Sequence, residues 1–161
     1  MTLRCDTKIY LFEEKKPWNT NIAVRNEINN GKRILYVSKV PLPILKSQLD
    51  APDHLINLKW FSARPEPDCV SPLNVEALSR TIKEFISHGP NGVIVLNGID
   101  VMSNWTYFSK IYATLQNIKQ IVSQNDHTLI ITIDPTSIDA RKLHLLETLV
   151  DKIVSKKSKS I

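Results

Sequence analysis

The stretch 92–100, GVIVLNGID, decides the fold class of this chain. Its apolar run, Val93 to Leu96, is unbroken and mostly strand-favouring, and polar or turn residues close both ends. A short run of this kind is typical of a strand buried on both faces, as in a parallel sheet covered by helices. Asn97, Gly98 and Asp100 follow directly. In open α/β sheets, ligands bind at this carboxyl end of the strands.

Strand and helix patterns alternate on both sides of that stretch. Strands are predicted at 8–12, 34–38, 55–61, 93–96 and 128–133. Helices are predicted at 19–30, 71–86 and 104–124, and from caps at 136–139 to residue 153. This alternation predicts a three-layer α/β domain with about five mostly parallel strands. We place the domain at residues 1–154 and a basic, flexible C-terminal tail at 155–161.

Particular residues predict where these elements begin and end. We expect Gly31 to end the first helix, and Ser71 to cap the second helix with Pro72 at its first position. Trp105 fits the apolar stripe of the helix predicted at 104–124. The proline-rich loop 65–72 is expected to be the least packed part of the chain.

The composition limits the classes of protein that fit the chain. Its 161 residues, 42% hydrophobic and 23% charged, suit one soluble globular domain. No run approaches the ~20 apolar residues of a membrane-spanning helix. The first residues hold no apolar signal core, so we expect a cytoplasmic protein with no membrane partner. The net charge of +5 includes lysines near the C-terminus, which suit nucleic acid or an acidic partner, or form a solvated helix end.

The glycines that nucleotide-binding loops require are missing from the expected place. A P-loop or a Rossmann fingerprint needs a glycine-rich turn after the first strand, where backbone N–H groups close around phosphates. Residues 12–21, FEEKKPWNTN, contain no glycine. Glu13 and Glu14 in that segment would also repel a phosphate. We therefore expect neither of these nucleotide sites and no cofactor.

The cysteines and histidines do not have the spacing of a metal site or of a nucleophile with its base. Cys5 and Cys69 are expected to be free thiols in a cytosolic setting, with a single disulfide as the alternative. The four histidines are expected at the surface or in helix caps. They are His54, His88, His127 and His144. We expect no metal and no catalytic residue of a known type.

Four polar residues lie near the predicted carboxyl ends of the strands. They are Glu14, Asn97, Asp100 and Asp134. At that edge they can hold a ligand or cap helices, and both roles stay open. Trp18 lies in a polar loop and fits either an exposed protein interface or a ring folded over the edge of the core. Trp105 is the second candidate interface residue.

Five stretches together carry a family resemblance. They are KIYLFEE at 8–14, ILYVSK at 34–39, SPLNVEALSRTIKEFI at 71–86, GVIVLNGIDVM at 92–102 and TLIITIDPTSIDARKLHLLE at 128–147. In this order and spacing the chain resembles the archaeal domain of unknown function 835, from about Lys8 to Val150. Members of that family occur alone or appended to archaeal sensory and response-regulator modules. The resemblance therefore implies a role in signalling or in protein interaction.

That family also looks similar to the RecA/KaiC-like ATPase core. On this analogy GVIVLN corresponds to the Walker B strand, whose last residue should be a carboxylate that organises Mg²⁺. Asn97 stands there, so the resemblance implies a pseudo-ATPase with a RecA-like topology. We predict a non-catalytic regulatory or protein-interaction module with a protein partner. The alternatives are a nucleic-acid-binding protein with a RecA-like fold and an enzyme with an unrecognised site at the carboxyl edge, and a homo-oligomer also stays open.

Overall fold

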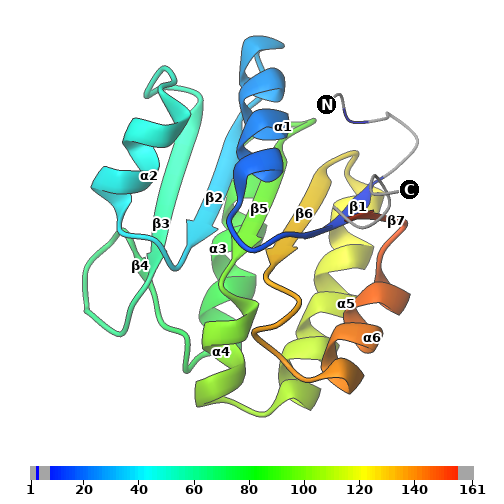
Figure 1. The fold of residues 1–161 in the computed structure, drawn as a ribbon. Coiled ribbons are helices and arrows are strands. Elements are labelled where there is room, and N and C mark those ends of the chain that lie inside the picture. The colour runs from blue at the N-terminus through cyan, green and yellow to red at the C-terminus, as the bar shows by residue number, and fades with distance from the viewer. Residues whose placement is uncertain (1–2, 4–7, 156–161) are drawn as a thin grey trace.

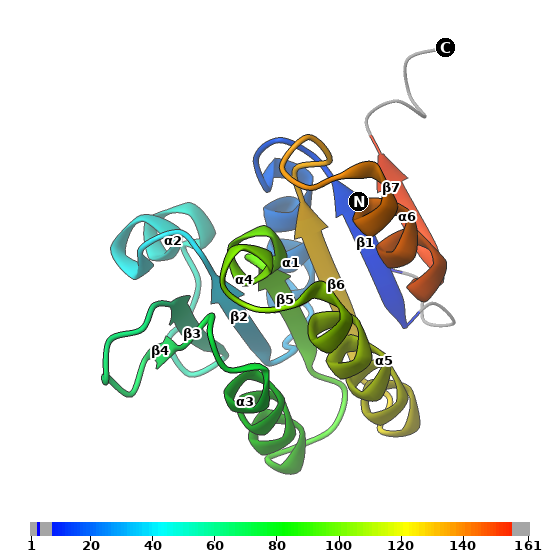
Figure 2. The ribbon, with the colours of Figure 1, turned by 90° about the horizontal axis from the view of Figure 1, so that it is seen from below.

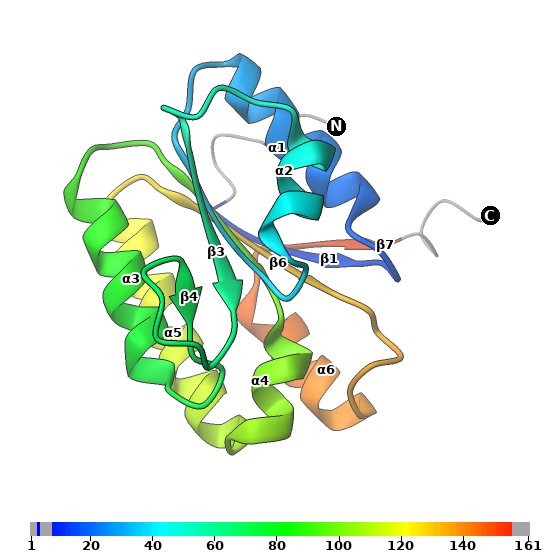
Figure 3. The same cartoon turned by 90° about the vertical axis from the view of Figure 1, so that its left-hand side faces the viewer.

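The computed structural model of the protein describes residue 3 and residues 8–155. Within this part of the chain, seven strands form one sheet in which every neighbouring pair is parallel (Figures 1 and 3). The strands are β1 (Ile9–Glu13), β2 (Ile34–Ser38), β3 (Ile56–Phe61), β4 (Cys69–Val70), β5 (Val93–Asn97), β6 (Thr128–Ile133) and β7 (Lys152–Ser155). Their spatial order is β4-β3-β2-β5-β6-β1-β7. The predicted α/β class with a parallel sheet is confirmed.

Helices cover both faces of this sheet (Figure 3). One face is covered by α1 (Trp18–Asn29) and α2 (Leu42–Leu49). The other face is covered by α3 (Val75–Ser87), α4 (Ile99–Trp105), α5 (Phe108–Gln124) and α6 (Ala140–Leu149). The core therefore consists of two apolar layers, one on each side of the sheet.

The central strand β5 is buried along its whole length. Val93 and Val95 face α1 and α2, whereas Ile94 and Leu96 pack in the opposite layer. Successive side chains of a strand point to opposite faces. A strand can therefore be apolar at every position only where helices cover both faces, as the run in GVIVLNGID predicts.

The carboxyl ends of the strands lie at one edge of the sheet, which Figure 2 shows from below. The chain leaves β1 and β2 toward α1 and α2, but it leaves β5 and β6 toward the opposite face. β2 is next to β5, and β1 is next to β6. Neighbouring connections that diverge in this way open a crevice at the carboxyl edge, where α/β sheets bind ligands.

The predicted number of about five strands is wrong, because β4 and β7 add to the five expected strands. β4 lies inside the loop that we expected to be least packed, and its Val70 is buried. β7 lies where the last helix was expected to continue. α6 ends at Leu149, and Ile153 pairs with Leu11 of β1 instead of extending a helical stripe. Both strands are short edge strands, and neither has the long apolar run that marks a central strand.

The predicted tail and one of the two cysteines lie partly or wholly outside the described residues. Ser155, the first residue of the predicted tail, belongs to β7, and the remaining tail residues 156–161 lie outside the described residues. Cys69 carries a free thiol, as predicted. Cys5 lies outside the described residues.

The predicted cap of α3 is wrong. The helix begins at Val75, and the side chain of Asn74 accepts hydrogen bonds from the N–H groups of Glu76 and Ala77. Asn is as good a cap as Ser, and its position next to the first helical turn decides between them. Ser71 instead accepts a hydrogen bond from the N–H of Leu73 in the preceding turn.

The long helix predicted at 104–124 is two helices. Thr106 is extended between α4 and α5, and this break removes Trp105 from the apolar stripe of α5. By contrast, Gly31 ends α1 as predicted. It has a positive φ of 81°, and its N–H bonds to the carbonyl of Ile28 while that of Lys32 bonds to the carbonyl of Glu27. These two bonds form a Schellman motif.

His127 is buried, although the sequence predicts it at the surface or in a cap. It is 1% exposed, and its Nδ1 accepts a 2.8 Å hydrogen bond from the N–H of Gly92. Burial is the largest effect and lowers the pKa of His127, as do the charges of Arg33 and Lys8, whereas a backbone hydrogen bond with Gly92 and the charge of Asp126 oppose this shift. The neutral imidazole is therefore part of the packed core next to β5.

Acid is expected to destabilise the protein through His127. Because its folded pKa lies below the ordinary value of 6.5, the unfolded chain binds more protons below pH 6.5. Above that pH, His127 does not lower the free energy of unfolding. Below it, the free energy of unfolding falls by at most about 1.4 kcal/mol per pH unit, the limit for one proton. His127→Asn keeps an oxygen acceptor for Gly92 but does not titrate.

Denaturant unfolding at a series of pH values tests this expectation. The loss of unfolding free energy below pH 6.5 should become smaller in His127→Asn. The exposed-site control His54→Asn should keep the wild-type dependence. An identical pH dependence in wild type and His127→Asn contradicts the prediction.

Candidate functional site

A pocket of about 270 Å³ opens at the carboxyl edge of the sheet. It lies among the loops that follow β1, β2, β5 and β6, and Figure 2 looks on to this edge. Its lining includes both charged and buried polar side chains. Those that matter below are Glu14, Lys39, Asn97, Thr132 and Asp134, with Trp18 at the exposed rim.

The carboxylate of Glu14 occupies the start of α1. It accepts hydrogen bonds from the N–H of Asn19 at 3.0 Å, and from the N–H and hydroxyl of Thr20 at 2.9 and 2.7 Å. The free N–H groups and the dipole at the start of a helix attract anions. Glu14 supplies that anion from within the chain, so these donors of α1 are already used.

A row of polar side chains crosses the sheet beside Glu14. Ser38, Asn97 and Thr132 are register partners on β2, β5 and β6, and strand alternation places them on the face covered by α1 and α2. The Ser38 hydroxyl accepts a 3.0 Å hydrogen bond from the N–H of Val40. Asn97 and Thr132 are only 5% and 2% exposed, and both line the pocket.

The side chains of Asn97 and Thr132 have unused hydrogen-bonding capacity. In the described part of the chain, no hydrogen bond joins the Asn97 carboxamide or the Thr132 hydroxyl to a protein group. Buried polar groups nearly always have a partner. These two groups therefore differ from the other polar side chains of the site, because only the pocket can supply their partners.

Asp100 and Asp134 are held by their own surroundings. Asp100, in the first turn of α4, forms a 2.7 Å ion pair with Lys39 and does not itself line the pocket. Asp134 accepts hydrogen bonds from the N–H and hydroxyl of Thr136 at 2.9 and 2.7 Å. These bonds lower the pKa of Asp134, so its carboxylate stays ionised and orders the loop after β6.

A hydrogen-bonded network that includes two lining residues of the pocket ties α1 to the sheet and to α2. The Tyr36 hydroxyl donates a 2.7 Å hydrogen bond to Oδ1 of Asn21, whose Nδ2 lies 3.5 Å from Oε1 of Gln48. Burial, together with the nearby charge of Glu14, raises the pKa of Tyr36. The phenol therefore remains a hydrogen-bond donor, and the start of α1 is held from two sides.

Both candidate interface tryptophans are largely exposed. Trp18 is 68% exposed at the rim of the pocket, and Trp105 is 62% exposed at the last residue of α4. Neither ring is folded into the core. Exposed indoles are common in protein interfaces, so their exposure fits the interface hypothesis.

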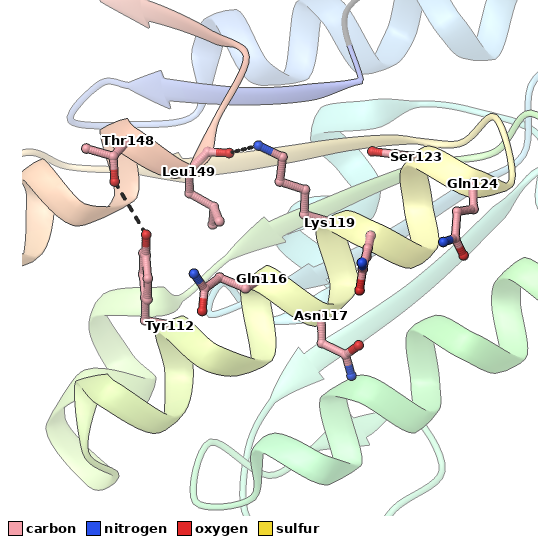
Figure 4. A pocket seen from close by; sticks show the side chains of 9 residues that line it. Tyr112, Gln116, Asn117, Lys119, Ser123, Gln124, Thr148 and Leu149 are labelled. Carbon is pink, nitrogen blue, oxygen red and sulfur yellow. Dashed lines mark hydrogen bonds between the residues drawn. The ribbon is translucent and has the colours of Figure 1, made fainter.

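A larger groove of about 770 Å³ runs along the outer side of α5, next to the end of α6 (Figure 4). Lys119 there donates a 2.6 Å hydrogen bond to the carbonyl oxygen of Leu149, and the hydroxyls of Tyr112 and Thr148 lie 3.4 Å apart. Gln116 and its neighbours come from the polar face of the helix. None of the polar side chains that line this groove is buried, so we place the candidate site at the sheet edge instead.

Part of this site is predicted by the sequence. Glu14, Asn97 and Asp134 lie at one pocket as expected of residues at the carboxyl edge, whereas Asp100 reaches it only through Lys39. Thr132 is missed because its role comes from its register with Asn97. Strand register is not readable from the sequence, although the threonine inside an otherwise apolar strand is a signal. No group of three or more His, Cys, Asp or Glu side chains in the described residues could hold a metal ion.

Comparisons with known proteins give a family but no activity. A family model described as "Protein of unknown function (DUF835)" matches residues 14–150. No curated protein matches the chain significantly. In the part of the chain that the structure describes, no helix is both long enough and apolar enough to cross a membrane.

Proposed function

The chain belongs to the DUF835 family, and from this premise we propose that it is a non-catalytic interaction module of an archaeal regulatory system, built on a RecA/KaiC-like core that does not handle nucleotides. The observation that carries the proposal is the Glu14 carboxylate at the start of α1. It takes the backbone hydrogen bonds that a nucleotide phosphate would need. A phosphate in this place would also meet a negative charge.

Two further features support the RecA/KaiC-like part of the proposal. β6 lies between β1 and β5, so one strand separates the strand before α1 from the strand in the Walker B position, as in RecA-like ATPases. Asn97 ends β5 where such an ATPase carries its Mg²⁺-organising carboxylate. A carboxamide oxygen is uncharged, and Mg²⁺ in nucleotide sites is bound by carboxylates together with the substrate phosphates.

The exposed tryptophans support the interaction part of the proposal. Trp18 and Trp105 expose most of their side chains on the carboxyl-edge side of the fold. Large aromatic residues are enriched among the residues that dominate binding energy in interfaces. A protein partner that covers either indole would remove apolar surface from water.

Nucleotide titration tests the proposed absence of catalysis. Isothermal calorimetry with Mg-ATP and Mg-GTP is expected to show no micromolar binding, and phosphate release is expected to stay at the background rate. The matched variant Asn97→Ala should behave like wild type in both assays. Micromolar binding of either nucleotide, or turnover that Asn97→Ala abolishes, contradicts the proposal.

A pull-down from native cell extract tests the interaction. A specific partner should be retained by the wild type and by Leu145→Ser, an exposed apolar control on α6. Its retention should fall about tenfold or more in Trp18→Ser or Trp105→Ser, since truncating an interface hot spot costs about 2 kcal/mol or more. Salt-dependent binding of DNA in fluorescence anisotropy, with no partner lost in either tryptophan variant, would favour the nucleic-acid alternative instead.

A further inference from the structure

The pocket at the carboxyl edge contains two polar groups that the architecture leaves without a partner. Asn97 and Thr132 are register partners on neighbouring strands, which lie about 4.8 Å apart. The carboxamide offers a donor and an acceptor, and the hydroxyl can act as either. Neither the carboxamide nor the hydroxyl is closed off from solvent, so both groups face the space of the pocket. Their position in the wall of a pocket therefore points to a bound molecule as their partner.

The charges around these groups indicate an uncharged ligand. The carboxylates of Glu14 and Asp134 line the same pocket, and the anion-binding start of α1 is filled by Glu14. Lys39 is paired with Asp100. Lys15 and Lys16 also line the pocket but are exposed to solvent, where their charge is screened. An anionic group near Asn97 would approach two like charges, and the cations that line the pocket are either paired with Asp100 or exposed to solvent.

The size of the pocket indicates a small molecule, and the aromatic ring at its rim suits a flat one. Its volume of about 270 Å³ is just below the range of about 300–1,000 Å³ for pockets of drug-sized ligands. The indole of Trp18 is mostly exposed at the rim, and stacking on an aromatic side chain stabilises any nucleobase. An Asn carboxamide can also pair with the donor and acceptor on one edge of an adenine.

We propose that this pocket binds a purine base, either free or as its nucleoside. The Asn97 carboxamide and the Thr132 hydroxyl bind the polar edge of the base, and the Trp18 indole covers one of its faces. The inference goes beyond the proposed function, because it assigns a small ligand to the module whether or not a protein partner is bound.

Calorimetry on the full chain tests this inference with adenine, adenosine, guanosine and AMP as probes. At least one purine nucleoside or base is expected to bind with a dissociation constant of about 0.1–1 mM, a reasonable value for a ligand of this size. AMP is expected to bind no tighter than adenosine. Thr132→Val and Asn97→Leu keep the approximate side-chain volumes, and each should weaken binding about tenfold or more through lost hydrogen bonds.

The outcomes separate this inference from the proposed function. The pocket assignment is overturned if no purine probe binds at ~10 mM, tenfold above the expected range. It is also overturned if Thr132→Val binds the purine as tightly as the wild type does. In either case only water is left as the partner of the Asn97 carboxamide and the Thr132 hydroxyl. AMP binding about tenfold tighter than adenosine overturns the uncharged-ligand assignment. Mg-ATP turnover overturns the non-catalytic function alone. If Asn97→Leu does not fold, the binding measured with Thr132→Val decides whether the pocket assignment holds. Thr132→Val should fold, with a melting temperature no lower than that of the wild type.

Discussion

Glu14→Ala is expected to lower the free energy of unfolding by about 1–3 kcal/mol. The substitution removes three hydrogen bonds to a carboxylate at the start of α1. Loss of a helix cap costs about 0.5–2 kcal/mol, and the favourable charge at the helix dipole adds roughly 0.3–1 kcal/mol. The N–H groups of Asn19 and Thr20 then lack a protein acceptor, so the variant should bind phosphate or sulfate where the wild type does not.

Urea unfolding with and without phosphate measures both parts of this expectation. With a dissociation constant on the order of 10 mM, about 100 mM phosphate would restore roughly 1.4 kcal/mol in Glu14→Ala relative to wild type. Chloride at the same ionic strength should restore nothing. Glu76→Ala is the matched control, since Glu76 is an exposed acid in the first turn of α3. A loss no larger than that of Glu76→Ala would show that Glu14 does not anchor α1.

Gly98→Ala is expected to destabilise the protein by about 2 kcal/mol or more. Gly98 has a φ of 158°, which residues with a side chain rarely adopt. A Cβ at this position would lie 2.4 Å from a ring carbon of the buried Phe61. Overpacking costs about 1–3 kcal/mol, and a strained backbone costs about as much again. Both costs fall at the first residue after β5, next to the candidate pocket.

Two comparisons separate the backbone cost from the clash. Gly31→Ala places a side chain at a φ of 81° with no atom within 4 Å, so it reports the backbone cost alone, about 1–2 kcal/mol. In a double-mutant cycle, Phe61→Leu should relieve at least about 1 kcal/mol of the loss in Gly98→Ala. If Gly98→Ala costs no more than Gly31→Ala, the contact with Phe61 does not constrain the loop.

The fold class could be predicted because strands that are covered on both faces carry an unmistakable pattern. The apolar runs of β5 and β6 and the amphipathic stripe of α5 follow directly from burial. Edge strands lack that signal. β4 is two residues long, and β7 has two exposed residues out of four, so neither differs locally from a loop or a helix end. Their pairing depends on contacts with β3 and β1 from distant parts of the chain.

The candidate site could be predicted only as an edge. Parallel strands have their carboxyl ends at the same edge of the sheet. This explains why one pocket is lined by Glu14, Asn97 and Asp134. What each side chain does depends on atoms that the sequence does not place. Glu14 is the acceptor for two amides several residues later in the chain. The pairing of Asn97 with Thr132 depends on the register between β5 and β6. His127 is missed for the same reason, since its partner Gly92 precedes a different strand.

The position of β1 between β6 and β7 also has a consequence for how the chain is synthesised. Ile9 pairs with Leu129, and Tyr10 pairs with Lys152. Both neighbours of β1 are therefore translated long after it, and β1 leaves the ribosome before either of them exists. Non-local pairing of this kind slows folding and exposes apolar segments to aggregation. Until β6 and β7 have been made, the apolar segment IYLF lacks both of its neighbours in the sheet.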